Sequence, residues 1–303
     1  MDRPADSRPL RKRLTFGKVV IHLALITLCI ACLYPFAVIL GTSFKSEKDI
    51  IVHGYSIFPK NFSETAYRMV LHNPKILLHS YGVTAVTTIA GALIGMWVTT
   101  AYAFVISRKD YPYRSFLAFL IFFTMLFHGG MVPSYILMVK WLGLKNNLLA
   151  LILPYIISGW YVLLMKGFLK TLPDALFESA KIDGAGEFKI FTKIALPLSK
   201  PALATLGLFL VLQYWNDWWL TLLYIDKENL MTLQYMLIRV LKNMEFLNSA
   251  EAVQYGLVKE GMQVPALGAR MAMCILAAGP MLVIFPFFQK YFIRGLTVGS
   301  VKG

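Results

Sequence analysis

The sequence predicts an all-α membrane protein with six transmembrane helices. Hydrophobic residues make up 57% of the 303 residues and charged residues only 15%, whereas a soluble domain carries roughly 25% charged residues. The mean hydropathy is +0.61, and several apolar runs approach the roughly 20 residues that a helix needs to cross a bilayer. We therefore expect one six-span domain over 19–290, with tails at 1–18 and 291–303.

The first expected span, at 19–42, follows a basic tail at 1–18. This apolar run is too long for a signal-peptide core, and no small-residue cleavage site follows it, so we expect it to be retained. Basic residues cluster beside the spans, as the positive-inside rule requires of cytoplasmic segments. The net charge of +14 therefore indicates membrane topology, with both termini cytoplasmic, and not a nucleic-acid partner.

The second, third and fourth spans are expected at 81–106, 115–141 and 147–169, after an outer segment at 43–79 and around a short basic turn at 107–114. Gly91 and Gly95 have a small-xxx-small spacing that permits close helix packing. In the third span, Gly129, Gly130 and Pro133 should weaken or kink the helix. His128 beside this break could line a solute path, although a satisfied interior histidine is the favoured explanation.

A strongly polar segment at 170–200 separates the fourth span from the fifth. Apolar residues recur among its charges, which predicts two short amphipathic helices. The expected break is Gly184-Ala185-Gly186, because glycine is tolerated at a helix end and costly inside one. Pro197 should end the unit. An apolar face that lipid does not cover predicts a partner protein at the membrane surface.

The fifth and sixth spans are expected at 201–225 and 265–289, separated by an outer segment with a helix at 231–243 along the membrane surface. Asn216 and Asp217 lie in the fifth span, about 15 residues or roughly 22 Å along a helix from its start, which places Asp217 toward the outer part of the membrane. An intramembrane carboxylate is costly and usually faces the bundle interior. Three roles stay open for this pair: hydrogen bonding between helices or at a gate, a place on the solute path, or a hydrated position at the interface.

No catalytic or metal-binding constellation is evident in the sequence. Glu178 and Asp183 are five residues apart and do not share a helix face well. The cysteines lack the further Cys or His residues of a zinc set, and no phosphate-binding G-x-x-x-x-G-K-[ST] loop is present. We therefore expect no enzyme activity, no metal and no cofactor, so that any ATP hydrolysis takes place on another subunit.

The polar segment resembles the E-A-A loop of bacterial ABC-importer permeases. The family pattern is E-A-A, then a glycine, then I-x-L-P, and this chain has Glu178-Ser179-Ala180, Gly184 and Ile194-Ala195-Leu196-Pro197. Ser179 replaces the usual alanine, which is a change between small residues. Asp183, Ala185 and Phe191 fit the carbohydrate-importer version, and the end of the chain from Gly295 resembles the tail of MalG-type permeases. With six expected spans, the resemblance extends over nearly the whole chain.

The resemblance implies a permease subunit of a sugar or oligosaccharide importer in the bacterial cytoplasmic membrane. Its partners would be a homologous second permease, two ATPase subunits, an extracytoplasmic solute-binding protein and membrane lipid. The loop at 170–200 would be the cytoplasmic coupling helix, and its contact or shaping residues would be Glu178, Ser179, Ala180, Asp183, Gly184, Ala185, Phe191, Ile194, Leu196 and Pro197. A tail that reaches the ATPase interface would contribute Thr297, Gly299, Val301, Lys302 and Gly303, although an ordinary frayed terminus is the alternative.

Two other functions fit parts of the sequence. An ion-coupled secondary carrier would need several membrane carboxylates and inverted repeats, but Asp217 is the one clear intramembrane acid and no repeat is evident. An ABC permease for a non-sugar solute would share the polar loop. The MalG-like tail favours the carbohydrate permease.

Overall fold

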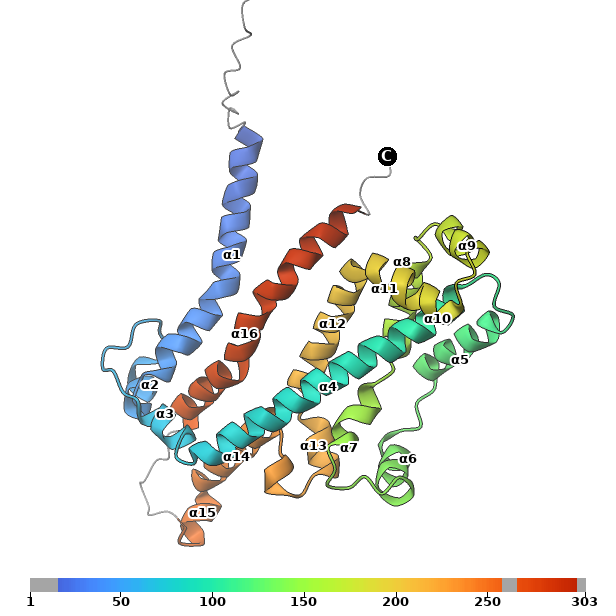
Figure 1. Cartoon of the computed structure of the whole chain (residues 1–303). Coiled ribbons are helices and arrows are strands. Elements are labelled where there is room, and N and C mark those ends of the chain that lie inside the picture. Colours follow the sequence, from blue (N-terminus) through green and yellow to red (C-terminus); the bar gives the residue numbers. More distant parts are fainter. Residues whose placement is uncertain (1–15, 258–265, 299–303) are drawn as a thin grey trace, which may run out of the picture. The chain divides into compact units, whose positions relative to one another are not determined.

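The computed structural model describes residues 16–257 and 266–298, and within these ranges helices joined by turns and loops are the regular elements, with one isolated β-bridge between Lys45 and Phe62 (Figure 1). It divides into two compact units. The first unit comprises 1–68 with 265–272, and the second comprises 69–264 with 273–303.

The first unit contains α1 (Phe16–Ser43), α2 (Glu47–His53), most of α3 (Thr65–Val70) and the start of α16 (Ala266–Val298). The Glu47 carboxylate accepts hydrogen bonds from the backbone N–H groups of Leu267 and Gly268, both at 3.0 Å. A carboxylate at a helix N-terminus satisfies N–H groups that have no partner inside the helix and complements the helix dipole. A residue close to α1 therefore caps the last helix of the chain.

The second unit is built around α4 (Pro74–Ser107), which packs against α12 (Lys200–Trp215) and α8 (Gly159–Leu169). The predicted close approach at Gly91 and Gly95 is confirmed. A Cβ atom at Gly91 would overlap the ring of Tyr214, and one at Gly95 would lie 3.3 Å from the carbonyl oxygen of Ile156. The small residues of α4 thus allow α12 and the chain before α8 to approach its backbone.

Three helices in the described residues are long and apolar enough to cross a membrane: Gly17–Ser43, Pro74–Ser107 and Ala266–Pro286. Three bent helix pairs meet the same criterion and bring the number to six if each pair forms one span. The chain thus has three continuous candidate spans, or up to six when each bent pair is counted as one. The third pair joins Glu187–Leu198 to Lys200–Trp215, so it includes part of the polar segment.

The predicted break in the third span is confirmed. α5 (Arg114–Leu126) ends before the two glycines, and α6 (Met131–Ile136) with the π-helix η1 (Leu137–Trp141) continues at an angle of 113°. This sharp turn needs the conformational freedom of Gly130, whose φ is 88°.

The expectation of continuous fourth and fifth spans is wrong. The fourth begins as α7 (Leu149–Ile152) and η2 (Leu153–Tyr155), then bends by 52° before α8. In the fifth, α12 ends at Trp215, and α13 (Trp219–Tyr224) follows a break at 216–218. Pro154 accounts for the first break, since proline disrupts a continuing helix. The second break depends on tertiary hydrogen bonds described below.

Several predicted boundaries also shift. α1 begins at Phe16, inside the expected N-terminal tail, and α4 begins at Pro74, seven residues before the expected start at 81. α16 continues to Val298, well into the expected C-terminal tail. Apolar runs mark the part of a helix that lipid can surround, whereas these helices continue beyond it.

The segment between α13 and α16 contains η4 (Glu228–Leu230), α14 (Leu233–Leu247) and α15 (Ala250–Gln254). α14 confirms the helix expected at 231–243. Its buried side includes Leu233 and Met236 and packs against α4, and the backbone N–H of Leu233 donates to Thr84 Oγ1 at 2.8 Å. The helix is therefore attached to the bundle along one side.

Candidate functional site

The polar segment forms the two short helices that its sequence predicts. α9 (Asp174–Ile182) is followed by a turn at 183–186, and α10 (Glu187–Ile190) continues as the π-helix η3 (Phe191–Ala195) and α11 (Leu196–Leu198). Pro197 lies inside α11, so the prediction that it ends the unit is wrong. The chain instead turns by 83° between Leu198 and Lys200. Pro197 lies in the last turn of the continuous helix Glu187–Leu198, directly after the π-helix.

The turn after α9 is a hydrogen-bonded helix end. Gly184 has a φ of 75°, its N–H donates to the carbonyl of Lys181 at 3.0 Å, and the N–H of Ala185 donates to the carbonyl of Ala180 at 2.9 Å. These two bonds around a left-handed residue form the Schellman arrangement, in which glycine is preferred. The break that the sequence places at 184–186 is therefore a defined turn.

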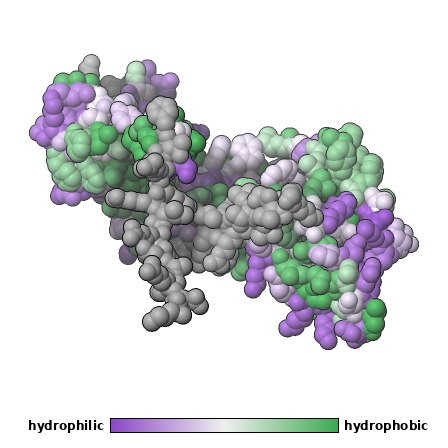
Figure 2. Space-filling view, turned by 90° about the horizontal axis from the view of Figure 1, so that it is seen from above, coloured by the Kyte–Doolittle hydropathy of each residue, from purple (hydrophilic) through white to green (hydrophobic). Residues whose placement is uncertain are grey.

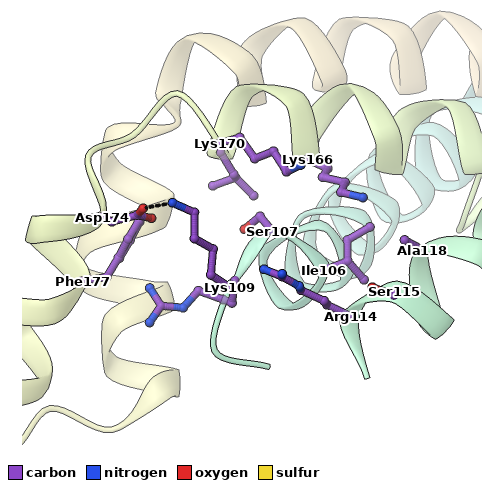
Figure 3. Close-up of a pocket in the computed structure, with 12 residues that line it drawn as sticks. Ile106, Ser107, Lys109, Arg114, Ser115, Ala118, Lys166, Lys170, Asp174 and Phe177 are labelled. Carbon is purple, nitrogen blue, oxygen red and sulfur yellow. Dashed lines mark hydrogen bonds and ion pairs between the residues drawn. The ribbon is translucent and has the colours of Figure 1, made fainter. Parts of the chain in front are cut away.

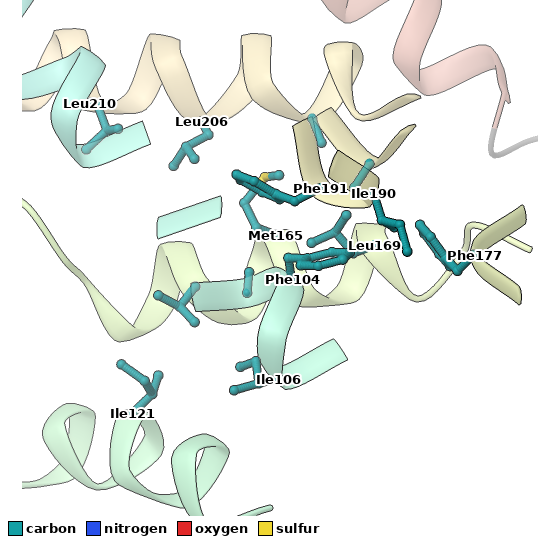
Figure 4. Close-up of a cluster of buried hydrophobic side chains, with 14 of the residues drawn as sticks. Phe104, Ile106, Ile121, Met165, Leu169, Phe177, Ile190, Phe191, Leu206 and Leu210 are labelled. Atoms are coloured by element: carbon teal, nitrogen blue, oxygen red, sulfur yellow. The ribbon is translucent and has the colours of Figure 1, made fainter. Parts of the chain in front are cut away.

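One side of the polar segment is anchored in the main core of the second unit. Phe177, Ala180, Ile190 and Phe191 are all buried. The ring of Phe191 lies 5.4 Å from that of Phe104 on α4, and the ring of Phe177 lies 6.1 Å from the same ring (Figure 4). Ala180 and Phe191, two of the predicted contact residues, thus hold the segment on the bundle and are not part of its surface.

The other side of the segment is open. Ile182 is 86% exposed and Phe188 is 72% exposed. Among the predicted contact residues, Glu178, Ser179, Asp183, Gly184 and Pro197 are exposed, and Ala185, Ile194 and Leu196 are half-buried. The right-hand part of the space-filling view, on the side where Figure 1 shows α9 and α10, mixes hydrophilic and hydrophobic surface (Figure 2). Such a surface suits a protein partner better than lipid or water alone.

Ion pairs join the polar segment to the turn between α4 and α5. The Lys181 ammonium contacts Asp110 and lies 2.6 Å from Glu187 Oε1. Lys109 Nζ lies 2.6 Å from Asp174 Oδ2. These pairs were not predicted, because Asp110 and Lys181 are 71 residues apart in sequence and no local pattern connects them.

The Lys181 ammonium changes the acidity of its partner. The pKa of the Asp110 carboxyl is lowered from 3.8 to about 2, chiefly by its hydrogen bond with Lys181 and also by the Arg108 guanidinium, against a smaller rise from burial. The pKa of Lys181 is raised in turn by its hydrogen bonds to Asp110 and Glu187. Both partners are therefore charged at neutral pH, and α9, α10 and the α4–α5 turn are held together electrostatically.

Asp217 lies in the break between α12 and α13, where its carboxylate has two partners. Oδ1 accepts from the Tyr155 hydroxyl at 2.7 Å, and Oδ2 accepts from the N–H of Leu220 at 3.1 Å. The Thr232 hydroxyl also donates to the Asp217 carbonyl at 3.2 Å. The structure thus provides the bonds that a helix-joining role requires. Tyr155 is a partner that the sequence did not indicate, and a place on the solute path stays a prediction.

The other expected site residues are not brought into this network. Asn216 is exposed, and its amide donates to the carbonyl of Leu212 at 2.9 Å. His128 is exposed between α5 and α6 in this single chain, and both its interior position and its place on the solute path stay predictions. Thr297 belongs to α16, whereas Gly299, Val301, Lys302 and Gly303 lie outside the described residues. Among the described residues, no group of three or more His, Cys, Asp or Glu could hold a metal ion.

Comparisons with known proteins match most of the chain. Residues 91–298 match the model of the family described as binding-protein-dependent transport system inner membrane component. Protein LplC of Bacillus subtilis is 39% identical over 269 residues, which are 89% of each chain. The polygalacturonan/rhamnogalacturonan transport system permease protein YtcP of the same organism is 35% identical over 94% of this chain and 98% of its own.

A solved structure has the same fold. It belongs to a bacterial ABC transporter involved in the import of the acidic polysaccharide alginate, and it is 27% identical with a TM-score of 0.74, over 94% of this chain and 100% of that chain. The match of the family model to more than half of the sequence, together with relatives above 30% identity over most of their length, shows that this chain belongs to the inner membrane components of binding-protein-dependent ABC transport systems.

Proposed function

We propose that this chain is the permease subunit of an ATP-driven importer of sugars or oligosaccharides in the bacterial cytoplasmic membrane. The substrate class is supported by relatives named for saccharides. These include the polygalacturonan/rhamnogalacturonan permease and an arabinooligosaccharide permease of Halalkalibacterium halodurans, which is 27% identical over 89% of this chain. The permease role is supported by family membership and by the apolar helices.

The observation that carries the coupling proposal is the exposed apolar surface of a firmly anchored polar segment. Ile182 and Phe188 project from helices whose opposite side is buried. Covering a large apolar side chain contributes roughly 1.5–3 kcal/mol, so a fitted partner gains substantially from these two contacts. In this proposal the partner is a separate ATPase subunit, the segment at 170–200 is cytoplasmic, and both chain termini lie on the same side.

The geometry suits transmission of motion from that partner. Lys181 contacts both Asp110 beside α4 and Glu187 on α10, and Phe191 packs on Phe104 of α4. A pull on the segment would therefore move the end of α4 as well. Closure of two ATPase subunits would switch the pathway between inward and outward access as a rigid-body transition. A homologous second permease would enclose the pathway, and an extracytoplasmic solute-binding protein would deliver the sugar.

The test replaces Phe188 by aspartate in the tagged full chain and measures membrane insertion, ATPase copurification and sugar uptake. We expect insertion at the normal level and loss of both copurification and uptake, because a charge in the apolar contact is left without a partner when it is buried. Phe246→Asp, at an exposed apolar residue on α14, is the matched control and should keep the ATPase. Normal copurification of the ATPase with Phe188→Asp would contradict the proposed contact. Purification of the wild-type chain with no ATPase would favour a secondary carrier.

A further inference from the structure

A basic pocket lies where α4 ends, α5 begins and α8 ends. Its volume is about 660 Å³. Figure 3 shows its side chains reaching in from α8 on one side and from the α4–α5 turn on the other. Five of its lining residues are cationic and one is acidic: Arg108, Lys109, Arg114, Lys166 and Lys170, with Asp174. The coupling contact proposed above does not use this concave surface.

Two of the five cations are already neutralised within the chain. Arg108 lies 3.2 Å from Asp110 and stacks over the Phe177 ring at 4.9 Å. Lys109 lies 2.6 Å from Asp174, the one acidic residue of the pocket. The remaining three, Arg114, Lys166 and Lys170, are the cations left for a ligand.

These three cations form a group without a counter-charge. In the part of the chain that the structure describes, none of them forms an ion pair with a carboxylate. The charges of Lys170 and Arg114 instead act on Lys166, so the three groups repel one another. A concave surface lined by one sign of charge concentrates the opposite sign. The pocket therefore requires a compact anion with several acceptor oxygens, which is the chemistry of a phosphate group.

The position of the pocket at helix ends favours a lipid headgroup over a free anion as the source of the phosphate. Ser107 is the last residue of α4, Arg114 is the first of α5, and Lys170 directly follows α8. The ends of membrane-crossing helices lie at the level of lipid headgroups, and basic pockets between such helices bind anionic headgroups. The wall also includes the half-buried Ala118, which offers apolar contact to the rest of a lipid.

We propose that this pocket binds the phosphate headgroup of an anionic phospholipid. Arg114 offers a planar pair of donors to two phosphate oxygens, and Lys166 and Lys170 supply point charges from the opposite wall. Ala118 would lie beside the start of the acyl chains. The inference depends on membrane insertion alone, so it stands or fails separately from the sugar substrate and the ATPase contact.

The experiment uses the full tagged chain, purified together with the subunits that copurify and transferred to lipid-exchanged nanodiscs. Native mass spectrometry measures retained phosphatidylglycerol and phosphatidylcholine. The test variant combines Arg114→Gln, Lys166→Gln and Lys170→Gln. The matched control combines Lys60→Gln, Lys75→Gln and Lys140→Gln at exposed positions, which remove the same charge outside both the pocket and the segment at 170–200. We expect wild type and control to prefer phosphatidylglycerol, and the test variant to retain it roughly tenfold less or worse, given the attraction of each basic residue for anionic lipid.

Three results would overturn the proposal. The first is that the wild type retains phosphatidylcholine as well as phosphatidylglycerol. The second is that the test variant retains as much phosphatidylglycerol as the wild type. The third is that Lys170 cross-links to an acidic segment of a copurifying subunit. Binding of inorganic phosphate to the same variants is measured separately. If phosphate binds the same three residues while phosphatidylglycerol is not retained, the ligand is a free anion and the lipid is excluded. Should the triple variant misfold, Lys170→Gln alone must still lower retention of phosphatidylglycerol relative to Lys140→Gln.

Discussion

Gly184 shows how one residue sets the shape of the proposed coupling site. Space around it is open, since a Cβ there would meet nothing within 4 Å, but its φ of 75° is strained for any residue with a side chain. We expect Gly184→Ala to destabilise this turn by about 1–2 kcal/mol and to weaken ATPase copurification. Gly186→Ala is the control, because Gly186 has an ordinary φ of −69° and equally open space. Equal behaviour of the two variants in copurification and thermal unfolding would refute the role of the left-handed turn.

Gly91 illustrates a different constraint, that of close approach. A methyl group there would overlap the ring of Tyr214, which is buried and whose hydroxyl donates to the carbonyl of Ile152 at 2.8 Å. We expect Gly91→Ala to lower stability by about 1–3 kcal/mol through overpacking, measured as a lower unfolding temperature in detergent. Gly82→Ala, on the same helix with nothing within 4 Å, should be neutral or slightly stabilising, because alanine favours helix more than glycine does. An unfolding temperature for Gly91→Ala at or above that of Gly82→Ala would contradict the packing argument.

The ion pairs around Lys181 act at the scale of elements, because they join α9 and α10 to the end of α4. With its pKa lowered to about 2, Asp110 contributes stability fully above its usual pKa of 3.8, and this contribution is lost as pH falls toward 2. The raised pKa of Lys181 keeps its side of the pair charged throughout this window. Because both groups are substantially exposed, solvent screening limits the contribution to about 0.2–1 kcal/mol.

Because the pKa of Asp110 is lowered, the stability of the folded chain should fall on acidification. We expect the stability difference between wild type and Asp110→Asn to be constant from about pH 7 to pH 5 and to shrink between about pH 4 and pH 2. Lys181→Gln removes the other partner and should give a difference that shrinks over the same range. Thermal unfolding across this pH series is the measurement. A difference that grows on acidification would show that the pair does not stabilise the folded chain.

The sequence predicts some elements well because their causes are local. Alternating charged and apolar residues and the glycines at 184 and 186 are enough to predict the α9–α10 pair, and Gly129 with Gly130 predicts the break after α5. The break at 216–218 is different. It depends on Asp217 meeting Tyr155 and Leu220, and Tyr155 lies 62 residues away. The apolar run resumes directly after Asn216 and Asp217, so an apolar pattern alone predicts one helix where the structure has two.

The same distinction applies within the candidate site. The E-A-A pattern identifies the segment, but it does not distinguish the buried Ala180 and Phe191 from exposed residues such as Glu178 and Asp183. That division depends on which side of α9 and α10 faces Phe104. It also depends on the pairing of Lys181 with Asp110, for which the sequence carries no local signal.

At the scale of the whole molecule, the chain displays far more apolar surface than a soluble monomer tolerates. The most apolar stretch of α1 has none of its residues buried within the chain, and α5 exposes large side chains including Phe116, Phe119 and Phe123. Lipid and a second permease subunit would cover these faces, which is the arrangement that the proposed function requires.

The end of the chain carries a further whole-molecule prediction. Deleting residues 299–303 leaves α16, which extends to Val298, at its full length. We expect normal assembly with the ATPase but weaker solute-stimulated ATP hydrolysis, because the resemblance places this tail at the ATPase interface. Replacement of the same five residues by a Gly/Ser sequence controls for length. Unchanged stimulation in both variants would leave an ordinary frayed terminus as the explanation.

The cap that Glu47 places on α16 also bears on how the protein is made. Its two acceptor bonds reach residues 220 and 221 positions later, and a ribosome that adds about 5–20 residues per second needs roughly 10–45 s to cover that interval. During this time the partners of Glu47 do not yet exist, and the first unit lacks the helix start that completes it. The N-terminal helices must therefore wait in the bilayer until translation is nearly finished, so slowed or truncated synthesis would leave this unit incomplete and open to membrane proteases.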